Sequence, residues 1–436
     1  NSVLRQWEAR GQVRFKQLRG FSRLFPIPMY IDETSVKFNT NNMTLSGARL
    51  HLGKSDLTLS GELSGIRRAM LRGGKLKANF ELESDLIDCN QLMLAIGKGL
   101  QFSDQLASNS VRAFSEDSIS VLETDHLLAN TVDSVATDSI SQLFVVPKFL
   151  DLTLHTNAKK IDFKDLKLED VKGEVVIRDQ SINLSDLCMS SNIGSGDLTM
   201  VYTTKTDQEA TMGFELSLND ILVERLISLF PDIDTLVPML RSFEGMVDCQ
   251  MTATCKADST MSVLLPSVNA SCYLSGKNMV LLDGETFTEI SKTLMFKNKK
   301  RNMIDSIAVD LAIHDNKIEV FPFLVEMDRY KVAVGGTHNL DMTFDYHLSV
   351  LKSPVPFKLG IDIKGNLDDF KFKIVKCKYK DFLKPAKQAE LDSTRRNVRE
   401  EIRETIRKQI REAAPELGNS LSEIHPHTHG HVEEST

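Results

Sequence analysis

Residues 54–63 read KSDLTLSGEL, and this stretch sets the pattern from which the fold is predicted. Leu57, Leu59 and Leu63 share one parity, whereas polar residues occupy the positions between them. Strict alternation of this kind indicates a β-strand with one apolar and one polar face. Residues 41–50 repeat the pattern as NNMTLSGARL, so two such strands stand side by side in the sequence.

The same alternation recurs along most of the chain, for example in residues 75–84, 149–156, 305–314 and 341–350. Strands with one apolar face usually belong to antiparallel sheets. A glycine follows several of these runs, at Gly47, Gly61, Gly276, Gly336 and Gly365. Glycine permits a bulge or a bend in a strand. The sequence therefore predicts a mainly β protein, built as one elongated, curved antiparallel sheet with a few short helices.

Three short helices are expected between the strands. Residues 218–230, LNDILVERLISLF, suggest a helix with Asn219 or Asp220 as its N-cap. Residues 232–243 and about 284–296 suggest two more. Residues 103–142 are rich in Ser, Asp and Thr without clear periodicity, which is typical of a flexible polar insertion.

A basic amphipathic helix is predicted over residues 385–415, with Asp392, Ser393 or Thr394 as its N-cap. Ile402, Ile406 and Ile410 continue a narrow apolar stripe, which predicts light packing on the β body or none. A parallel stripe contains the arginines that we predict to contact an anionic membrane surface or a partner, namely Arg399, Arg403 and Arg407. The alternative is a solvated helix stabilised by i,i+4 ion pairs.

The predicted organisation has six parts. An N-terminal helical or connecting segment (1–30) precedes a β-rich repeat region (31–102), the polar insertion (103–142), a second β-rich region (143–384), the basic helix (385–415) and a disordered, histidine-containing tail (416–436).

Composition narrows the functional classes. The 436 residues carry a net charge of −7, which disfavours a broad nucleic-acid-binding surface. The sequence contains no run of eighteen apolar residues and therefore predicts no membrane-spanning helix. The first residue is Asn1, so we expect a processed chain or a fragment. Six scattered cysteines form no CxxC pair. Cys249 and Cys255 are interpreted as small apolar residues on the inner face of a strand, and the alternative is a cross-strand disulfide between Cys249 and Cys272.

Sequence motifs for catalysis are absent. HExxH, GxSxG and GxxxxGK[ST] do not occur, and six of the ten histidines are isolated in the sequence. The acidic residues occupy the polar parity of strands, where solvation explains them. We therefore expect no catalytic residue, metal ligand or cofactor, and no enzymatic activity.

Residues 240–375 resemble the C-terminal region of AsmA-family proteins, the periplasmic relatives of TamB. The resemblance rests on SGKNMVLLDGETF (275–287) and on residues 313–348, which begin IHDNKIEVFPF and end FDYHL. In a looser form it covers most of residues 31–380. The chain departs from the family pattern because it lacks the N-terminal membrane helix.

The resemblance implies a taco-like β-groove that moves phospholipid between the inner and outer membranes or maintains the outer membrane. It also implies a periplasmic location, with an inner-membrane anchor absent from this chain. Apolar residues of one parity would line the groove; the candidates are Met342, Phe344, Tyr346, Leu348, Ile361 and Ile363. The alternatives are a closed protein core and a periplasmic β scaffold that assists outer-membrane protein assembly through its exposed sheet edge.

Overall fold

The computed structural model places most of the chain in a single β-sheet. It describes residues 8–413 apart from 23–24, 33, 73, 97, 100–142, 164–165, 192–193, 207, 230–242, 282–301, 328–329, 340–342, 354–357 and 367–368. The polar insertion, the predicted helix at 284–296, nearly all of that at 232–243, Met342 and the C-terminal tail lie outside the described residues.

The described strands form one 22-stranded sheet, which confirms the predicted fold class. The strands are β1 (Arg10–Phe15), β2 (Leu18–Ser22), β3 (Phe25–Ile31), β4 (Thr34–Asn39), β5 (Asn42–Leu52), β6 (Ser55–Ser64), β7 (Leu76–Ser84), β8 (Ile87–Asp88), β9 (Leu150–Phe163), β10 (Leu166–Arg178), β11 (Ser181–Ser191), β12 (Gly194–Thr203), β13 (Glu209–Leu222), β14 (Phe243–Glu244), β15 (Met246–Asp258), β16 (Asn269–Leu281), β17 (Asn302–His314), β18 (Lys317–Met327), β19 (Tyr330–Asn339), β20 (Phe344–Lys352), β21 (Leu359–Gly365) and β22 (Phe370–Val375).

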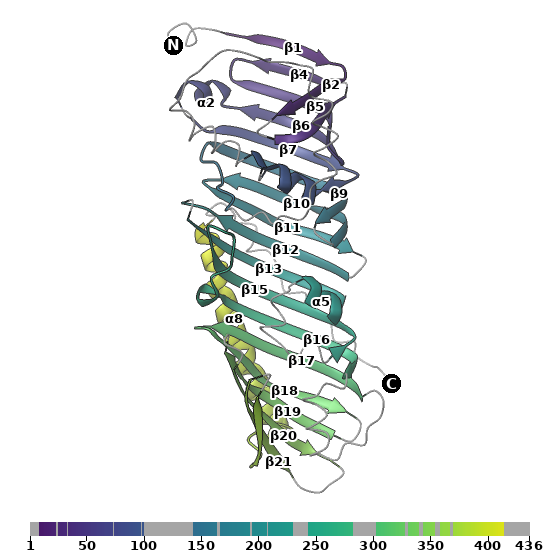
Figure 1. Cartoon of the computed structure of the whole chain (residues 1–436), viewed down its shortest axis with the longest axis vertical. Coiled ribbons are helices and arrows are strands. Elements are labelled where there is room, and N and C mark those ends of the chain that lie inside the picture. Colours follow the sequence, from purple (N-terminus) through teal and green to yellow (C-terminus); the bar gives the residue numbers. More distant parts are fainter. Residues whose placement is uncertain are drawn as a thin grey trace.

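Strands that follow one another in the sequence mostly pair antiparallel, which gives the long ladder of Figure 1. The parallel exception joins β7 to β9, with Leu76 opposite Leu150, and extends to the short strand β8. The two predicted β-rich regions, 31–102 and 143–384, are therefore parts of one continuous sheet. Antiparallel hairpins need only short turns, which explains why the alternating runs follow each other so closely.

Four of the five glycines, Gly47, Gly61, Gly276 and Gly336, lie within strands, which corrects the interpretation that a glycine follows each run; Gly365 alone of the five ends its strand, β21. Gly47 has a φ of +60° inside β5, where the register with β6 shifts between Leu45 and Ala48. Gly61 lies inside β6, and a Cβ there would be 2.1 Å from the carbonyl oxygen of Asn79 on β7. Glycine thus admits a bulge at one position and a close strand approach at the other.

The prediction of a helical or connecting segment at 1–30 is wrong for its described residues, and the helix predicted at 218–230 is confirmed only in part. Strands β1, β2 and β3 stand in this N-terminal region, where β1 pairs with β4 and β2 pairs with β3. In residues 218–230 the strand β13 continues to Leu222, and helix α5 occupies only Val223–Leu229. The register with β15 shifts between Leu218 and Ile221, and this irregularity resembles helical spacing in the sequence.

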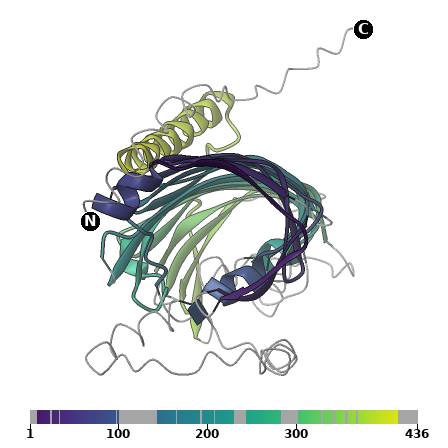
Figure 2. The ribbon, with the colours of Figure 1, turned by 90° about the horizontal axis from the view of Figure 1, so that it is seen from above.

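Few helices accompany the sheet in the described residues: α2 (Ile66–Arg72), α5, the 3-10 turn η2 (Leu265–Ser267) and α8 (Pro385–Ala413), with a further helical stretch after Asp88. Viewed along the long axis, the sheet is strongly curved and α8 lies outside the curve (Figure 2). Helix α8 begins seven residues before the earliest predicted N-cap. Proline suits the first helical position because its φ is already helical.

Candidate functional site

The two largest apolar clusters of the described residues lie on the concave face of the sheet. Helix α8 covers the convex side, where it contacts Glu215 on β13 and Asp310 on β17. The flanking residues of opposite parity, including Leu216 and Leu311, therefore point to the concave side. Leu311 belongs to a large cluster of buried apolar residues from α5 and strands β13 to β20.

The predicted groove residues share this face, as far as the structure describes them. On β20 and β21, Tyr346 lies opposite Ile363 and Leu348 opposite Ile361, while Phe344 lies opposite Gly365. The two isoleucines are buried, and Phe344, Tyr346 and Leu348 are half-buried. Burial raises the pKa of the Tyr346 hydroxyl to about 12. The alternation in the sequence therefore correctly predicted that these described residues share one face of the sheet.

The two cysteines of the disulfide hypothesis also lie on the concave face. Cys249 and Cys272 are buried, and both are free thiols. The strands β15 and β16 pair as the disulfide hypothesis required, but Cys249 lies opposite Leu274 and Cys272 opposite Met251. The two cysteines are therefore diagonal neighbours, and they serve as small apolar core residues.

Among the described residues, the apolar side chains of the concave face are less completely buried towards the N-terminal half of the sheet. There the apolar cluster contains Leu82, Ile87, Ala158 and Val171 as buried residues, but more of its members, including Leu154, are only partly buried. The described residues contain no second sheet that would close this face as in a β-sandwich. Apolar side chains that remain partly accessible on a concave surface offer a binding surface for apolar ligands.

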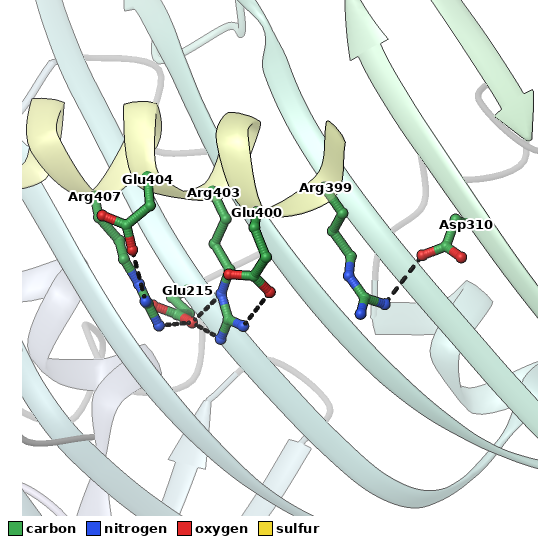
Figure 3. A network of polar contacts seen from close by, with 7 residues as sticks. All are labelled: Glu215, Asp310, Arg399, Glu400, Arg403, Glu404 and Arg407. Carbon is green, nitrogen blue, oxygen red and sulfur yellow. Dashed lines mark hydrogen bonds and ion pairs between the residues drawn. The ribbon is translucent and has the colours of Figure 1, made fainter. Parts of the chain in front are cut away.

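The three arginines predicted to face a membrane point instead to the sheet (Figure 3). Arg399 donates to Oδ1 of Asp310 over 3.0 Å, and its guanidinium lies 4.8 Å above the ring of Tyr273. Arg403 donates from Nε to Glu215 Oε1 over 2.8 Å, and Arg407 donates to both oxygens of the same carboxylate. In this arrangement their charges are directed at Glu215 and Asp310 and not at an external surface.

Glu215 and Asp310 correct the interpretation that strand acids on the polar parity are simply solvated. Their side chains are only 14% and 10% exposed. Burial alone would raise the pKa of Glu215, but the hydrogen bonds and charges of Arg407 and Arg403 hold it below its usual value. The sequence signal for these two acids was the arginine stripe, because a row of arginines needs carboxylates at matching positions on the surface against which it packs.

Helix α8 is firmly packed, which contradicts the expectation of light packing. Ile406 and Ile410 are 1% and 2% exposed, and they pack against Val201 of β12. A Cβ at Gly213 on β13 would be 2.9 Å from the Ile410 side chain, so this glycine makes room for the helix. A narrow stripe suffices because the missing side chain of Gly213 lets Ile410 pack closely against the sheet.

A second polar cluster on the convex face resembles a catalytic triad in composition. His347 Nδ1 lies 2.5 Å from Asp362 Oδ1, and His347 Nε2 lies 2.9 Å from Ser349 Oγ. Lys378 N–H donates to Nε2 and Tyr379 N–H donates to Ser349 Oγ, and Ser349 is fully buried. The bond from His347 lowers the pKa of Asp362. With no access to the serine, this cluster fastens residues 378–379 to the sheet.

Two negative findings hold for the described residues. None of their helices is long and apolar enough to cross a membrane. They contain no group of three or more His, Cys, Asp or Glu side chains placed to hold a metal ion.

Comparison with known proteins finds no matching family model, no matching curated protein and no matching solved structure. The resemblance to the AsmA family therefore stays a prediction made from residues 240–375.

Proposed function

We propose that the protein is a non-enzymatic envelope protein that holds phospholipid acyl chains along the concave face of its sheet. The observation that carries this proposal is the concentration of apolar residues on the concave face of a single curved sheet, where many of them are only partly buried. Each methylene group that an acyl chain buries on such a face contributes about 0.8 kcal/mol. A polar headgroup would stay at the open side, in water.

The proposed role is transfer of phospholipid between the inner and outer membranes, or maintenance of the outer membrane. The resemblance to the AsmA family supports this setting and the periplasmic location. The extended ladder of strands supports it physically, because neighbouring strands about 4.8 Å apart make a long, continuous surface. Such a role requires neither a catalytic group nor a cofactor.

Native mass spectrometry of the purified chain, followed by lipid extraction, tests the proposal. We expect bound phospholipid that is released on unfolding. A soluble protein without an apolar binding site, purified from the same cells in the same way, controls for lipid acquired during purification. A chain that carries no lipid, and takes up none from vesicles, would favour the protein-assembly scaffold instead.

A further inference from the structure

The C-terminal edge of the sheet combines exposed apolar and basic side chains. Phe372 and Ile374 on β22 are 42% and 61% exposed, and Lys371 and Lys373 alternate with them and are also exposed. In the described residues β22 pairs with β21 and has no partner on its other side. This strand therefore forms an open end of the ladder.

The exposed apolar side chains continue the concave face. Ile374 lies opposite Ile361, which is 1% exposed, and Phe372 lies opposite Ile363, which is 6% exposed. The exposure of the apolar side chains therefore rises sharply from β21, where they are buried, to the neighbouring edge strand β22. An apolar ligand on the concave face would meet these two side chains at this end of the sheet.

The positive charge extends beyond the strand. Lys376, Lys378 and Lys380 follow in the connecting segment and are exposed, and no acidic residue occurs between Phe370 and Lys380. Among the described residues, Lys371, Lys373 and Lys376 form no ion pair, although Lys378 lies 3.3 Å from Asp362. This local excess contrasts with a chain whose net charge is −7.

We infer that the β22 edge, defined as residues 370–380, docks on the surface of an anionic phospholipid membrane. Charge complementarity favours this partner, because lysines near an anionic surface are attracted to it while exposed aromatic and aliphatic side chains enter the interface. Edge lysines alone are a common device against strand addition, which disfavours a paired protein strand here. That device does not explain Lys376 and Lys380, which lie outside the strand.

The inference rests on the proposed function, since it names the surface with which the lipid-binding face would exchange its cargo. Co-sedimentation with phosphatidylcholine vesicles, with and without phosphatidylglycerol, tests it. We expect binding to the anionic vesicles only, reduced at least about tenfold by combining Lys371→Gln, Lys373→Gln and Lys376→Gln. Salt at about 1 M, where the Debye length is roughly 3 Å, should have a similar effect.

A matched control removes three exposed lysines elsewhere, at Lys160, Lys167 and Lys172, and should bind as the unmodified chain does. Equal loss in both triple variants, or no binding by the unmodified chain, would overturn the docking inference. So would a dimer in sedimentation velocity that Phe372→Ser disrupts, because the edge would then be occupied by a second copy. Lipid content is measured on each variant separately: a chain without lipid that still binds vesicles through these lysines refutes the proposed function and leaves the docking surface intact.

Discussion

Arg403 donates a hydrogen bond from Nε to Oε1 of Glu215 over 2.8 Å and so joins residues that are 188 positions apart in the sequence. Arg407 binds the same carboxylate, with its terminal nitrogen 3.0 Å from Oε1. One strand acid therefore anchors two successive turns of α8. Together with Arg399 and Asp310, this arrangement ties the helix across the convex face of β13 to β17.

Glu215→Gln should loosen α8. The substitution keeps the shape of the side chain but removes the charge on which Arg403 and Arg407 converge. We expect a loss of about 1–3 kcal/mol in the free energy of unfolding, because these are charge-assisted bonds at a site of low exposure. Amide hydrogen exchange should accelerate in α8 before it accelerates in the strands.

Glu209→Gln is the matched control for this prediction. Glu209 lies on the same strand and pairs with Lys256 at 2.9 Å, but both side chains are well exposed. An exposed pair contributes about 1 kcal/mol at most. Equal destabilisation by the two variants would contradict the anchoring role of Glu215.

Acidification should remove the contribution of Glu215. Its pKa in the folded protein is lowered, so its stabilising effect is complete above the unfolded value of about 4.3 and is lost as the pH falls through the folded value. The difference in melting temperature between the unmodified chain and Glu215→Gln should therefore be constant from about pH 7 to pH 5 and shrink below about pH 4.3. A difference that persists unchanged to about pH 2 would show that the charge is not responsible.

Gly213→Val should displace the C-terminal end of α8. The added side chain would occupy the space beside Ile410, and overpacking of this kind costs about 1–3 kcal/mol. Hydrogen exchange of residues 400–413 reports the displacement. Gly20→Val is the control, because a Cβ there would be 3.5 Å from the flexible end of Met29, an ordinary contact. If Gly213→Val leaves the hydrogen exchange of residues 400–413 unchanged, the packing of α8 does not require this glycine.

Ser349 should be inert towards a fluorophosphonate probe in the folded protein. The serine has the histidine and aspartate neighbours of a hydrolase, but it is fully buried and its oxygen accepts the N–H of Tyr379. We expect labelling only after unfolding. Stoichiometric labelling of Ser349 in the native chain, detected by peptide mass spectrometry, would reopen the question of an enzymatic function.

The sheet was predictable from the sequence because strand alternation is a local signal. Alternation alone predicts that Leu57 and Leu59 share a face of the sheet. It likewise predicts that Tyr346 and Ile363 lie on one face, and the two residues are opposite each other on the concave side. The bulge between Leu218 and Ile221 was not predictable from parity, because one irregular step converts alternation into a spacing that looks helical.

The convex-face contacts depended on non-local information. Nothing near Glu215 in the sequence distinguishes it from a solvated strand acid; its role follows from α8, almost two hundred residues away. Likewise, the arginine stripe of α8 suggested an anionic partner, and the chain itself supplies that partner. Among the described residues, Lys371 and Lys373 on β22 have no such ion-pair partner. The alternation of lysine and apolar residues in this strand was visible in the sequence, but its position at the edge of the sheet was not.

Site-specific photo-crosslinking tests the lipid-binding face most directly. A photoreactive amino acid is placed at Leu154 or Tyr346, on the concave face, and at the adjacent His155 or Asp345, which alternation puts on the convex face. The account predicts phospholipid adducts at Leu154 and Tyr346 and none at His155 and Asp345 when the chain is irradiated in cells. Equal labelling at both parities, or no lipid adduct at either concave position, would contradict it.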